Sequence, residues 1–374
     1  MDKINIATIF SGIGAPEQGL KRLGVPFRTI FACDNGEREV EIDYDKEFEK
    51  IKSLGSIKEK RDYADNLYKS SRNKVNFVQK SYLANYEVED DNFFQDVKLL
   101  DGRDFNGKID LFIGGSPCQS FSVGSNKRLG FEDTRGTLFF EFCRLVNEVQ
   151  PKVFIYENVF GVLGHDNGKT WKVMLNSFED LGYHYTWKLL NARDYGLPQN
   201  RKRIFVIGFK DEEAFKKFKF PEQIELKYTM QDFLEDKIKD GGLLSVNGNL
   251  TFTTEEKGEP GEEYFLSDKM KKYVLTPGTK NFTRKIETDR KIAAALVKGV
   301  YNTYRAGINN YITVGERLRH LTVRELHRLM GFPDDYKIVV SRTQAGKQAG
   351  NSIAVDTIMG IESEIIKAQG WDLE

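Results

Sequence analysis

The chain has 374 residues, with 56 Lys and Arg against 56 Asp and Glu, so its formal net charge is zero. Its 40% hydrophobic and 12% aromatic content is that of a globular protein of about two domains, and it excludes a disordered chain. Three cysteines, four histidines without metal-ligand spacing, and no apolar run of ~18 residues argue against disulfides, a metal site and a membrane span.

Short β-branched segments alternate with amphipathic ones through the first 210 residues. We predict strands at 4–10, 28–33, 109–113, 153–156 and 203–209, and helices from residue 15 to 23, at 138–149 and at 171–181. Strands that alternate with helices are typical of a parallel α/β sheet. Ligands of such sheets bind beyond the carboxyl ends of the strands.

Two regions depart from this alternation. Residues 43–92 carry 10 basic and 11 acidic side chains, and we interpret them as a helical insertion at the edge of the sheet, most simply a solvated decoration. Residues 211–317 have turn signals and short apolar runs, which indicate a smaller, irregular domain. Helix signals return at 323–330 and 353–368.

The zero net charge would argue against a nucleic-acid partner if it were evenly spread. It is not, because residues 232–263 have a net charge of −6 and residues 264–310 a net charge of +7. The basic stretch also contains Tyr273, Phe282, Tyr301 and Tyr304. Such a mixture fits a surface that follows phosphates and contacts bases, although a plain solvated face is an equally good reading.

Candidate binding residues follow the first strands. The turn after the first strand contains Phe10, Ser11, Gly12, Ile13 and Gly14. Its glycines would let a ligand approach the backbone, although a plain tight turn explains them as well. Asp34 ends the second strand, where a carboxylate can accept two ribose hydroxyls, and Asp96 is a second acid of this kind.

Candidate catalytic residues follow the later strands. Cys118 comes after a strand end and a proline, a position that favours an exposed thiolate, although a lone cysteine is more often a buried apolar residue. Glu157 directly follows an apolar strand, where a carboxylate is expensive to bury without a role. Arg201 and Arg203 alternate before another strand, so they are expected on one side of it.

In chain order these residues lie in the motifs FSGIG, GGSPCQSFS, ENV, QNRKR, RELHRLMGFP and QAGNS. Together the motifs resemble those of the DNA cytosine-5 methyltransferase family in its compact bacterial form. The resemblance implies a class I methyltransferase fold, which is a Rossmann-like, mostly parallel sheet flanked by helices. It also implies a catalytic domain of residues 1–210 plus 318–374 and a target recognition domain of residues 211–317.

The resemblance implies that S-adenosylmethionine binds at the first strand ends and leaves as S-adenosylhomocysteine. Phe10 would flank the adenine, and the backbone of residues 11–14 would line the methionine part. Asp34 would hold the ribose hydroxyls, and Asp96 the adenine amino group. The other cofactor residues expected are Asn35, which stands where relatives often have an aromatic residue, and Val97, Pro117, Leu138, Asn351, Ser352 and Ile353. No metal is expected.

The resemblance also implies the chemistry. Cys118 would add to C6 of a cytosine flipped out of the helix, after which C5 would take the methyl group and lose its proton as the thiolate leaves. Glu157 would engage N3 and the exocyclic amine, Arg203 would hold O2, and Arg201 would support the site. The loop at 121–136 would close over the base.

The expected function is therefore methylation of duplex DNA by a monomeric cytoplasmic enzyme of the nucleoid. A restriction endonuclease would be its functional partner. Three alternatives stay open at this point. They are a tRNA cytosine-5 methyltransferase with the same motifs, a catalytically silent nucleic-acid-binding module, and an NAD-dependent oxidoreductase that uses the glycine turn.

Overall fold

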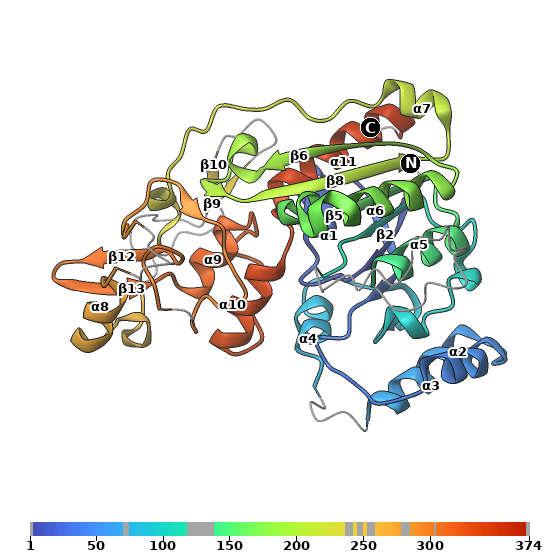
Figure 1. The fold of residues 1–374 in the computed structure, drawn as a ribbon, viewed down its shortest axis with the longest axis horizontal. Coiled ribbons are helices and arrows are strands. Elements are labelled where there is room, and N and C mark those ends of the chain that lie inside the picture. The colour runs from blue at the N-terminus through green and yellow to red at the C-terminus, as the bar shows by residue number, and fades with distance from the viewer. Residues whose placement is uncertain are drawn as a thin grey trace.

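The computed structural model describes residues 3–69, 75–117, 138–235, 242–244, 250–252, 259–277, 285–302 and 304–371. Figure 1 shows a twisted sheet flanked by helices and, beside it, a smaller region of short elements. No helix in these described ranges is long and apolar enough to cross a membrane.

The sheet has seven strands in the order β3-β2-β1-β4-β5-β8-β6. The strands are β1 (Ile4–Ile9), β2 (Phe27–Cys33), β3 (Phe93–Phe94), β4 (Leu111–Gly114), β5 (Val153–Val159), β6 (His184–Asn191) and β8 (Lys202–Phe209). The five neighbouring strands β3, β2, β1, β4 and β5 pair in parallel, whereas β8 runs antiparallel to both β5 and β6. The prediction of a mostly parallel sheet is confirmed, and its parallel carboxyl ends meet at one edge.

Alternating apolar side chains bury both faces of the sheet. Phe112 and Phe154 face α5 (Leu138–Val149) and α6 (Lys169–Asp180) in one core cluster. Ile113 and Ile155, their chain neighbours, face α1 (Ala15–Leu23) and α11 (Val355–Gln369) in another. This period of two is what a strand buried on both faces requires. The helices predicted at 138–149 and 353–368 thus cover opposite faces of the sheet.

The insertion at residues 43–92 forms α2 (Tyr44–Lys52), α3 (Ile57–Tyr68) and α4 (Phe77–Leu83), beside the edge strand β3 (Figure 1). Its helical character is as predicted. Its description as a solvated decoration is wrong, because Tyr68 and Tyr82 are fully buried and Lys60 is 8% exposed. A nearly balanced charge count conceals a face that packs against the sheet domain.

Residues 211–317 contain short elements, as their turn signals indicated. These are α7 (Glu212–Lys217), α8 (Asp268–Val274), the hairpin of β9 (Gly242–Leu244) and β10 (Leu250–Phe252), and β11 (Ala293–Ala294), which pairs in parallel with β7 (Gln199–Asn200). Strand β12 (Tyr311–Val314) pairs with β13 (Arg317–His320), and α9 (Val323–Leu329) and α10 (Arg342–Asn351) follow. The domain boundaries drawn from the sequence stay a prediction.

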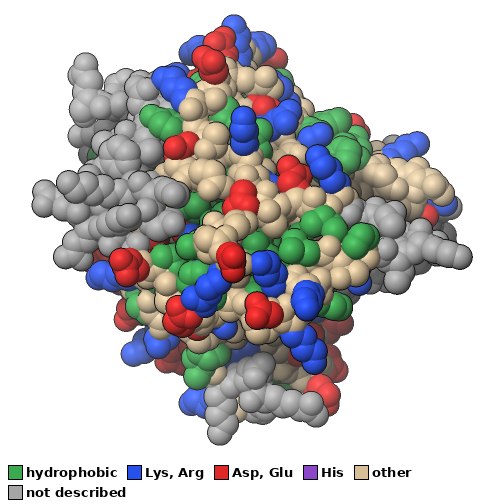
Figure 2. All heavy atoms as spheres, turned by 90° about the vertical axis from the view of Figure 1, so that its left-hand side faces the viewer, with side chains coloured by type: hydrophobic (Ala, Val, Ile, Leu, Met, Phe, Trp, Pro, Cys, Tyr) green, Lys and Arg blue, Asp and Glu red, His purple; other side chains and the backbone are tan. Residues whose placement is uncertain are grey.

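The expected basic and aromatic surface at 264–310 is only partly present. Tyr301 is 7% exposed and donates a hydrogen bond to the Leu321 carbonyl, so it belongs to a core. Tyr304 is half-buried, Tyr273 is exposed, and Phe282 lies outside the described residues. Figure 2 shows Lys and Arg interspersed with Asp, Glu and apolar side chains on this side of the molecule. Its described part is therefore a mixed surface and not a continuous basic one.

Candidate active site

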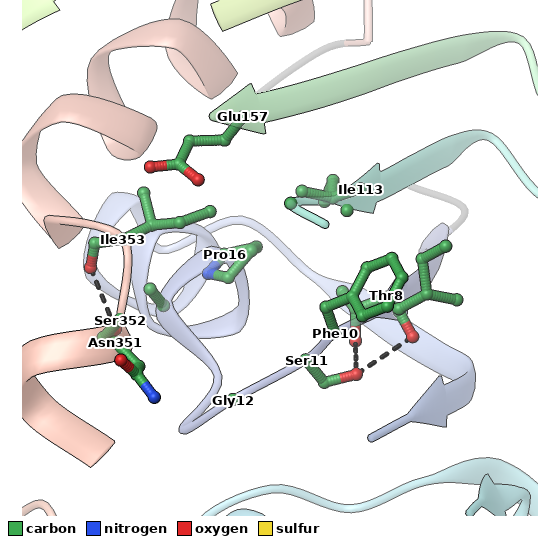
Figure 3. A pocket seen from close by; sticks show the side chains of 14 residues that line it. Thr8, Phe10, Ser11, Gly12, Pro16, Ile113, Glu157, Asn351, Ser352 and Ile353 are labelled. Carbon is green, nitrogen blue, oxygen red and sulfur yellow. Dashed lines mark hydrogen bonds between the residues drawn. The ribbon is translucent and has the colours of Figure 1, made fainter. Parts of the chain in front are cut away.

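A pocket opens at the carboxyl ends of β1, β4 and β5 (Figure 3). The space between its walls is about 410 Å³ with open solvent included. Its walls are formed by Thr8, Ile9, Phe10, Ser11, Gly12, Ala15, Pro16, Ile113, Gly114, Gly115, Glu157, Asn351, Ser352 and Ile353. The pocket thus joins the turn after β1 to Glu157 and to the far C-terminal segment.

The turn after β1 is held in an unusual conformation. Phe10 and Gly12 both have positive φ values, of 52° and 54°. The Ser11 hydroxyl accepts hydrogen bonds from the Cys33 amide at 3.0 Å and from the Thr8 hydroxyl at 2.9 Å. Ser11 therefore fastens β1 to β2 with its side chain. This leaves its backbone and that of Gly12 on the pocket wall.

Asp34, at the end of β2, is tied to the same turn. Its carboxylate accepts the Gly12 amide at 3.0 Å and the Gly36 amide at 2.8 Å. Burial raises the pKa of Asp34, while these two amides act to lower it. Asp96 follows the neighbouring strand β3 and is 6% exposed. The two acids thus lie at adjacent strand ends, beside the pocket and not on its wall.

Several residues expected at the cofactor have other contacts. Ile13 is in a core, and a Cβ on Gly14 would lie 2.2 Å from the Tyr86 ring, so the glycine is required by packing. The Asn35 side chain accepts the Glu37 amide and donates to the Arg38 carbonyl. The remaining three are Val97, which is buried, Leu138, which is half-buried, and Pro117, which is exposed. None of these six lines the described pocket.

Glu157 is the acid of the pocket. Its side chain is 12% exposed, and its Oε1 lies 3.0 Å from the Arg203 Nε. Burial raises the pKa of Glu157, and the charges of Arg203 and Arg201 oppose this shift. A Cβ on Gly115 would approach the Glu157 carboxylate to 2.9 Å, so that glycine leaves room for the acid. The carboxyl group can therefore carry a proton or hold a hydrogen bond in a dry site.

A hydrogen-bond network that the sequence did not reveal fixes the strand ends around Glu157. The Tyr156 hydroxyl lies 2.7 Å from the Ser116 hydroxyl and accepts the Asn158 amide group at 2.7 Å. All three residues are buried. They fix the end of β4, and the chain continues from there to Cys118. The position of Asn158 directly after Glu157 is the one sequence feature that points to this network.

Arg201 does not reach into the pocket. It is 2% exposed and donates to the carbonyls of Leu296 at 3.0 Å, Gly350 at 3.1 Å and Ser352 at 2.6 Å. Burial, assisted by the charge of Arg203, lowers the pKa of Arg201 to about 9. Its guanidinium fastens the pocket-lining C-terminal segment to residue 296. Its supporting role in the site stays a prediction.

Asn351 and Ser352 lie on the pocket wall, as Figure 3 shows. The Asn351 side chain donates to Glu37 at 3.0 Å, and Glu37 also pairs with Lys347 at 2.8 Å. Glu37 therefore connects the turn after β2 to the C-terminal segment, a role the sequence did not indicate. Cys118 and the loop at 121–136 lie outside the described residues, and their roles stay predictions.

The sheet order, its single antiparallel strand β8 and the glycine turn over a pocket define the class I methyltransferase fold. Among solved structures, the Dnmt2 methyltransferase of S. pombe is similar, with a TM-score of 0.62 over 98% of this chain and 99% of that chain. A putative prophage DNA modification methyltransferase of E. coli gives a TM-score of 0.58, covering 98% and 100% of the two chains. At 16% and 22% identity, both similarities concern the fold alone.

Sequence comparisons are more specific. The family model "C-5 cytosine-specific DNA methylase" matches residues 66–367. The type II methyltransferase M.HpaII of Haemophilus parainfluenzae is 36% identical, over 78% of this chain and 81% of its own. M.Bsp6I of Bacillus sp. (strain RFL6) is 31% identical, over 98% of this chain and 99% of its own. The chain therefore belongs to the C-5 cytosine-specific DNA methylase family and is a DNA cytosine-5 methyltransferase.

Proposed function

We propose that this enzyme transfers a methyl group from S-adenosylmethionine to C5 of a flipped cytosine in duplex DNA, through a covalent bond between Cys118 and C6. One observation carries the proposal. Glu157 is a buried acid with a raised pKa, it is held by Arg203, and it shares a pocket with the glycine turn. A pocket that places a proton donor beside a glycine turn suits transfer of a methyl group to a base.

The pocket fits the cofactor chemically. Gly12 leaves the wall free of a side chain, and Phe10 offers an aromatic ring beside it. The Asp34 carboxylate, already fixed by two amides, keeps lone pairs for ribose hydroxyls. When bound, S-adenosylmethionine supplies an electrophilic methyl group. The residues that would hold it are Phe10, Asp34 and Asp96, together with the backbone at Ser11, Gly12 and Ser352.

The chain's own residues would activate the base. The Cys118 thiolate adds to C6, and a proton from Glu157 to N3 neutralises the charge that this addition creates. Arg203, freed from Glu157, holds O2 of the base. C5 is then nucleophilic enough to accept the methyl group. Loss of the C5 proton to solvent restores the C5–C6 double bond and expels the thiolate. N3 returns its proton to Glu157, so that both the cysteine and the acid are regenerated.

Duplex DNA is the substrate we favour over tRNA. The curated relatives that match at 31–36% identity are named type II methyltransferases. C6 of a stacked base is inaccessible to a thiolate, so the cytosine must leave the helix, at a cost of a few kcal/mol.

We further propose that the enzyme acts as a monomer in the cytoplasm, at the nucleoid. A restriction endonuclease of the same site specificity would be its functional partner.

A trapping experiment tests this mechanism. Duplex DNA with 5-fluorocytosine cannot release fluorine in place of the C5 proton, so the enzyme should stay attached to it after methyl transfer. Denaturing gels should show the adduct with the native enzyme and S-adenosylmethionine, but not with Cys118→Ser or without cofactor. An adduct with Cys118→Ser would refute the covalent step. So would the absence of any adduct on a 5-fluorocytosine duplex whose unsubstituted form the native enzyme methylates. Adducts on tRNA alone would establish the alternative substrate.

A further inference from the structure

The helices of the insertion contact the two strand ends that carry Asp34 and Asp96, and also helix α10. The Asn76 side chain, at the start of α4, donates to the Asp34 carbonyl at 2.7 Å. From the middle of α4, the Ser81 hydroxyl donates to Gln348 of α10 at 2.8 Å. These contacts bridge the turn after β2 and the helix that ends at Asn351. The insertion is therefore built into the site at several points.

The most direct of these contacts is made by Tyr68, the last residue of α3. Its hydroxyl donates to the Asp96 Oδ2 at 2.6 Å, while the Asp96 Oδ1 accepts the Lys98 amide at 3.0 Å. Tyr68 and Asp96 are only 2% and 6% exposed. Burial and the charge of Asp96 raise the pKa of Tyr68 well above its usual value. The Tyr68 hydroxyl therefore keeps its proton and donates a hydrogen bond to Asp96.

The Tyr68 ring has little freedom to move. It packs in a small apolar cluster with Ile51 and Leu99, and the Arg38 guanidinium lies 4.7 Å from its centroid. Because α3 is itself anchored elsewhere, this arrangement is rigid. The Tyr44 hydroxyl also donates to Asp96. These three donors approach Asp96 from fixed directions, and together they determine how its carboxylate is turned.

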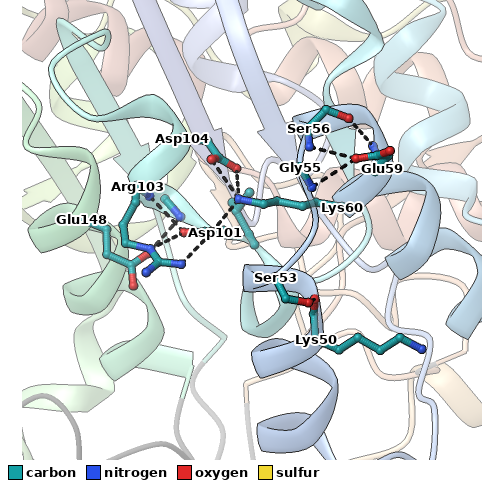
Figure 4. A network of polar contacts seen from close by, with 12 residues as sticks. Lys50, Ser53, Gly55, Ser56, Glu59, Lys60, Asp101, Arg103, Asp104 and Glu148 are labelled. Atoms are coloured by element: carbon teal, nitrogen blue, oxygen red, sulfur yellow. Dashed lines mark hydrogen bonds and ion pairs between the residues drawn. The ribbon is translucent and has the colours of Figure 1, made fainter.

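Helix α3 is anchored by a charged network on the side of the sheet domain (Figure 4). The Lys60 ammonium donates to Asp101 and to Asp104, each at 2.8 Å. Asp101 is also paired with Arg103. At the same N-terminal end of the helix, Ser56 and Glu59 form a capping box. The Lys60 contacts lie two helical turns before Tyr68, so they fix the helix that presents its hydroxyl.

We propose that Tyr68 is a positioning residue that orients Asp96 toward the exocyclic amine of the cofactor's adenine, so that helix α3 contributes to recognition of the cofactor base. This inference rests on the proposed function, because it takes Asp96 as the residue that meets the adenine. A carboxylate oxygen that already accepts one donor keeps a second lone pair in a defined direction. An amine at that position donates to it, whereas a carbonyl oxygen is repelled.

Binding of two product analogues tests the inference without requiring activity. S-adenosylhomocysteine has the amine, and S-inosylhomocysteine has a carbonyl oxygen in its place. Isothermal titration calorimetry should show that the native enzyme prefers the adenosyl compound. In Tyr68→Phe, the Asp96 carboxylate should no longer point at the amine, and its hydrogen bond to the adenosyl compound should be lost. Loss of a hydrogen bond to a charged group weakens binding about tenfold, while inosyl binding should change little. The preference for the amine should therefore fall.

The matched control is Tyr63→Phe, which removes a hydroxyl from the same helix. The Tyr63 hydroxyl donates to Glu47 and not to Asp96, so both affinities should stay at their native values. An unchanged preference in Tyr68→Phe would overturn the inference. An equal loss for both compounds would do so too, because it would indicate a purely structural role. If the native enzyme binds neither compound, the proposed cofactor itself is refuted.

Discussion

Replacing Glu157 with Gln separates the chemistry of the site from its architecture. Glutamine keeps the volume and an oxygen that can accept the Arg203 Nε, now 3.0 Å from the carboxylate. Its amide can still donate to N3 of the base, but it cannot transfer a proton. Loss of such transition-state stabilisation typically costs about 10²–10³ in rate. We expect a fall of that order in the methyl-transfer rate, with DNA and cofactor affinities within about threefold of native values.

The same substitution should change the pH dependence of stability. Burial raises the pKa of Glu157 in the folded state, so the fold binds its proton more tightly than the unfolded chain does. The stabilisation from this proton is complete below the pKa of the unfolded state and is lost as pH rises through the folded pKa. Glutamine does not titrate. The unfolding free energy of Glu157→Gln relative to the native enzyme should therefore increase as the pH rises above the ordinary glutamate pKa of 4.5.

Single-turnover transfer of a labelled methyl group to duplex DNA measures the rate, and urea unfolding at several pH values measures stability. Glu141→Gln is the matched control, because Glu141 is also buried and paired with an arginine, Arg144 at 2.7 Å, but does not line the pocket. It should leave the transfer rate unchanged. A native rate in Glu157→Gln would remove Glu157 from the mechanism. If Glu141→Gln lowered the rate as much as Glu157→Gln does, Glu157 would act only through the fold.

Two predictions concern the packing behind the pocket. Arg22 donates to both carboxylate oxygens of Asp356 at 2.8 and 2.9 Å, and both side chains are almost fully buried. Arg22→Met should therefore lower the unfolding free energy, measured by urea titration, by about 3–5 kcal/mol. A loss below about 1 kcal/mol would contradict this. Gly14→Ala should lower the melting temperature far more than Gly24→Ala. Both glycines have φ near 70–77°, but only at Gly14 would the new Cβ meet a ring, that of Tyr86 at 2.2 Å, so equal effects would refute the packing argument.

The sequence predicted five strands of the sheet correctly because each is a short apolar run that ends in a glycine or a polar residue. It missed the two edge strands of the sheet. Strand β3 (Phe93–Phe94) is only two residues long, and β6 (His184–Asn191) has exposed positions, among them Trp187 and Lys188. Edge strands lack the continuous apolar pattern of buried ones. Nor could periodicity predict that β8 inserts antiparallel between β5 and β6, because strand direction depends on tertiary pairing.

The site was predictable where residue types carry the chemistry and not where backbone atoms do. Glu157 could be proposed from its position at a strand end, and Arg203 from its position before the next strand. Their ion pair was not predicted. The partners of Arg201 are three carbonyl oxygens, which leave no mark on a sequence. The insertion was misjudged for a related reason. Lys60 finds its carboxylates 41 and 44 residues further along the chain, so a local charge count could not separate its buried face from its exposed one.

The most direct test of the central claim is bisulfite sequencing of DNA from a bacterial host that expresses the enzyme. We predict that cytosines in one short sequence context are protected from conversion, and only in DNA from the host that expresses the native enzyme. A host with Cys118→Ser should give fully converted DNA. Complete conversion in both hosts, with the folded native enzyme present, would contradict the assignment of this chain as an active DNA cytosine-5 methyltransferase. Protection that persists with Cys118→Ser would contradict the assignment of its nucleophile.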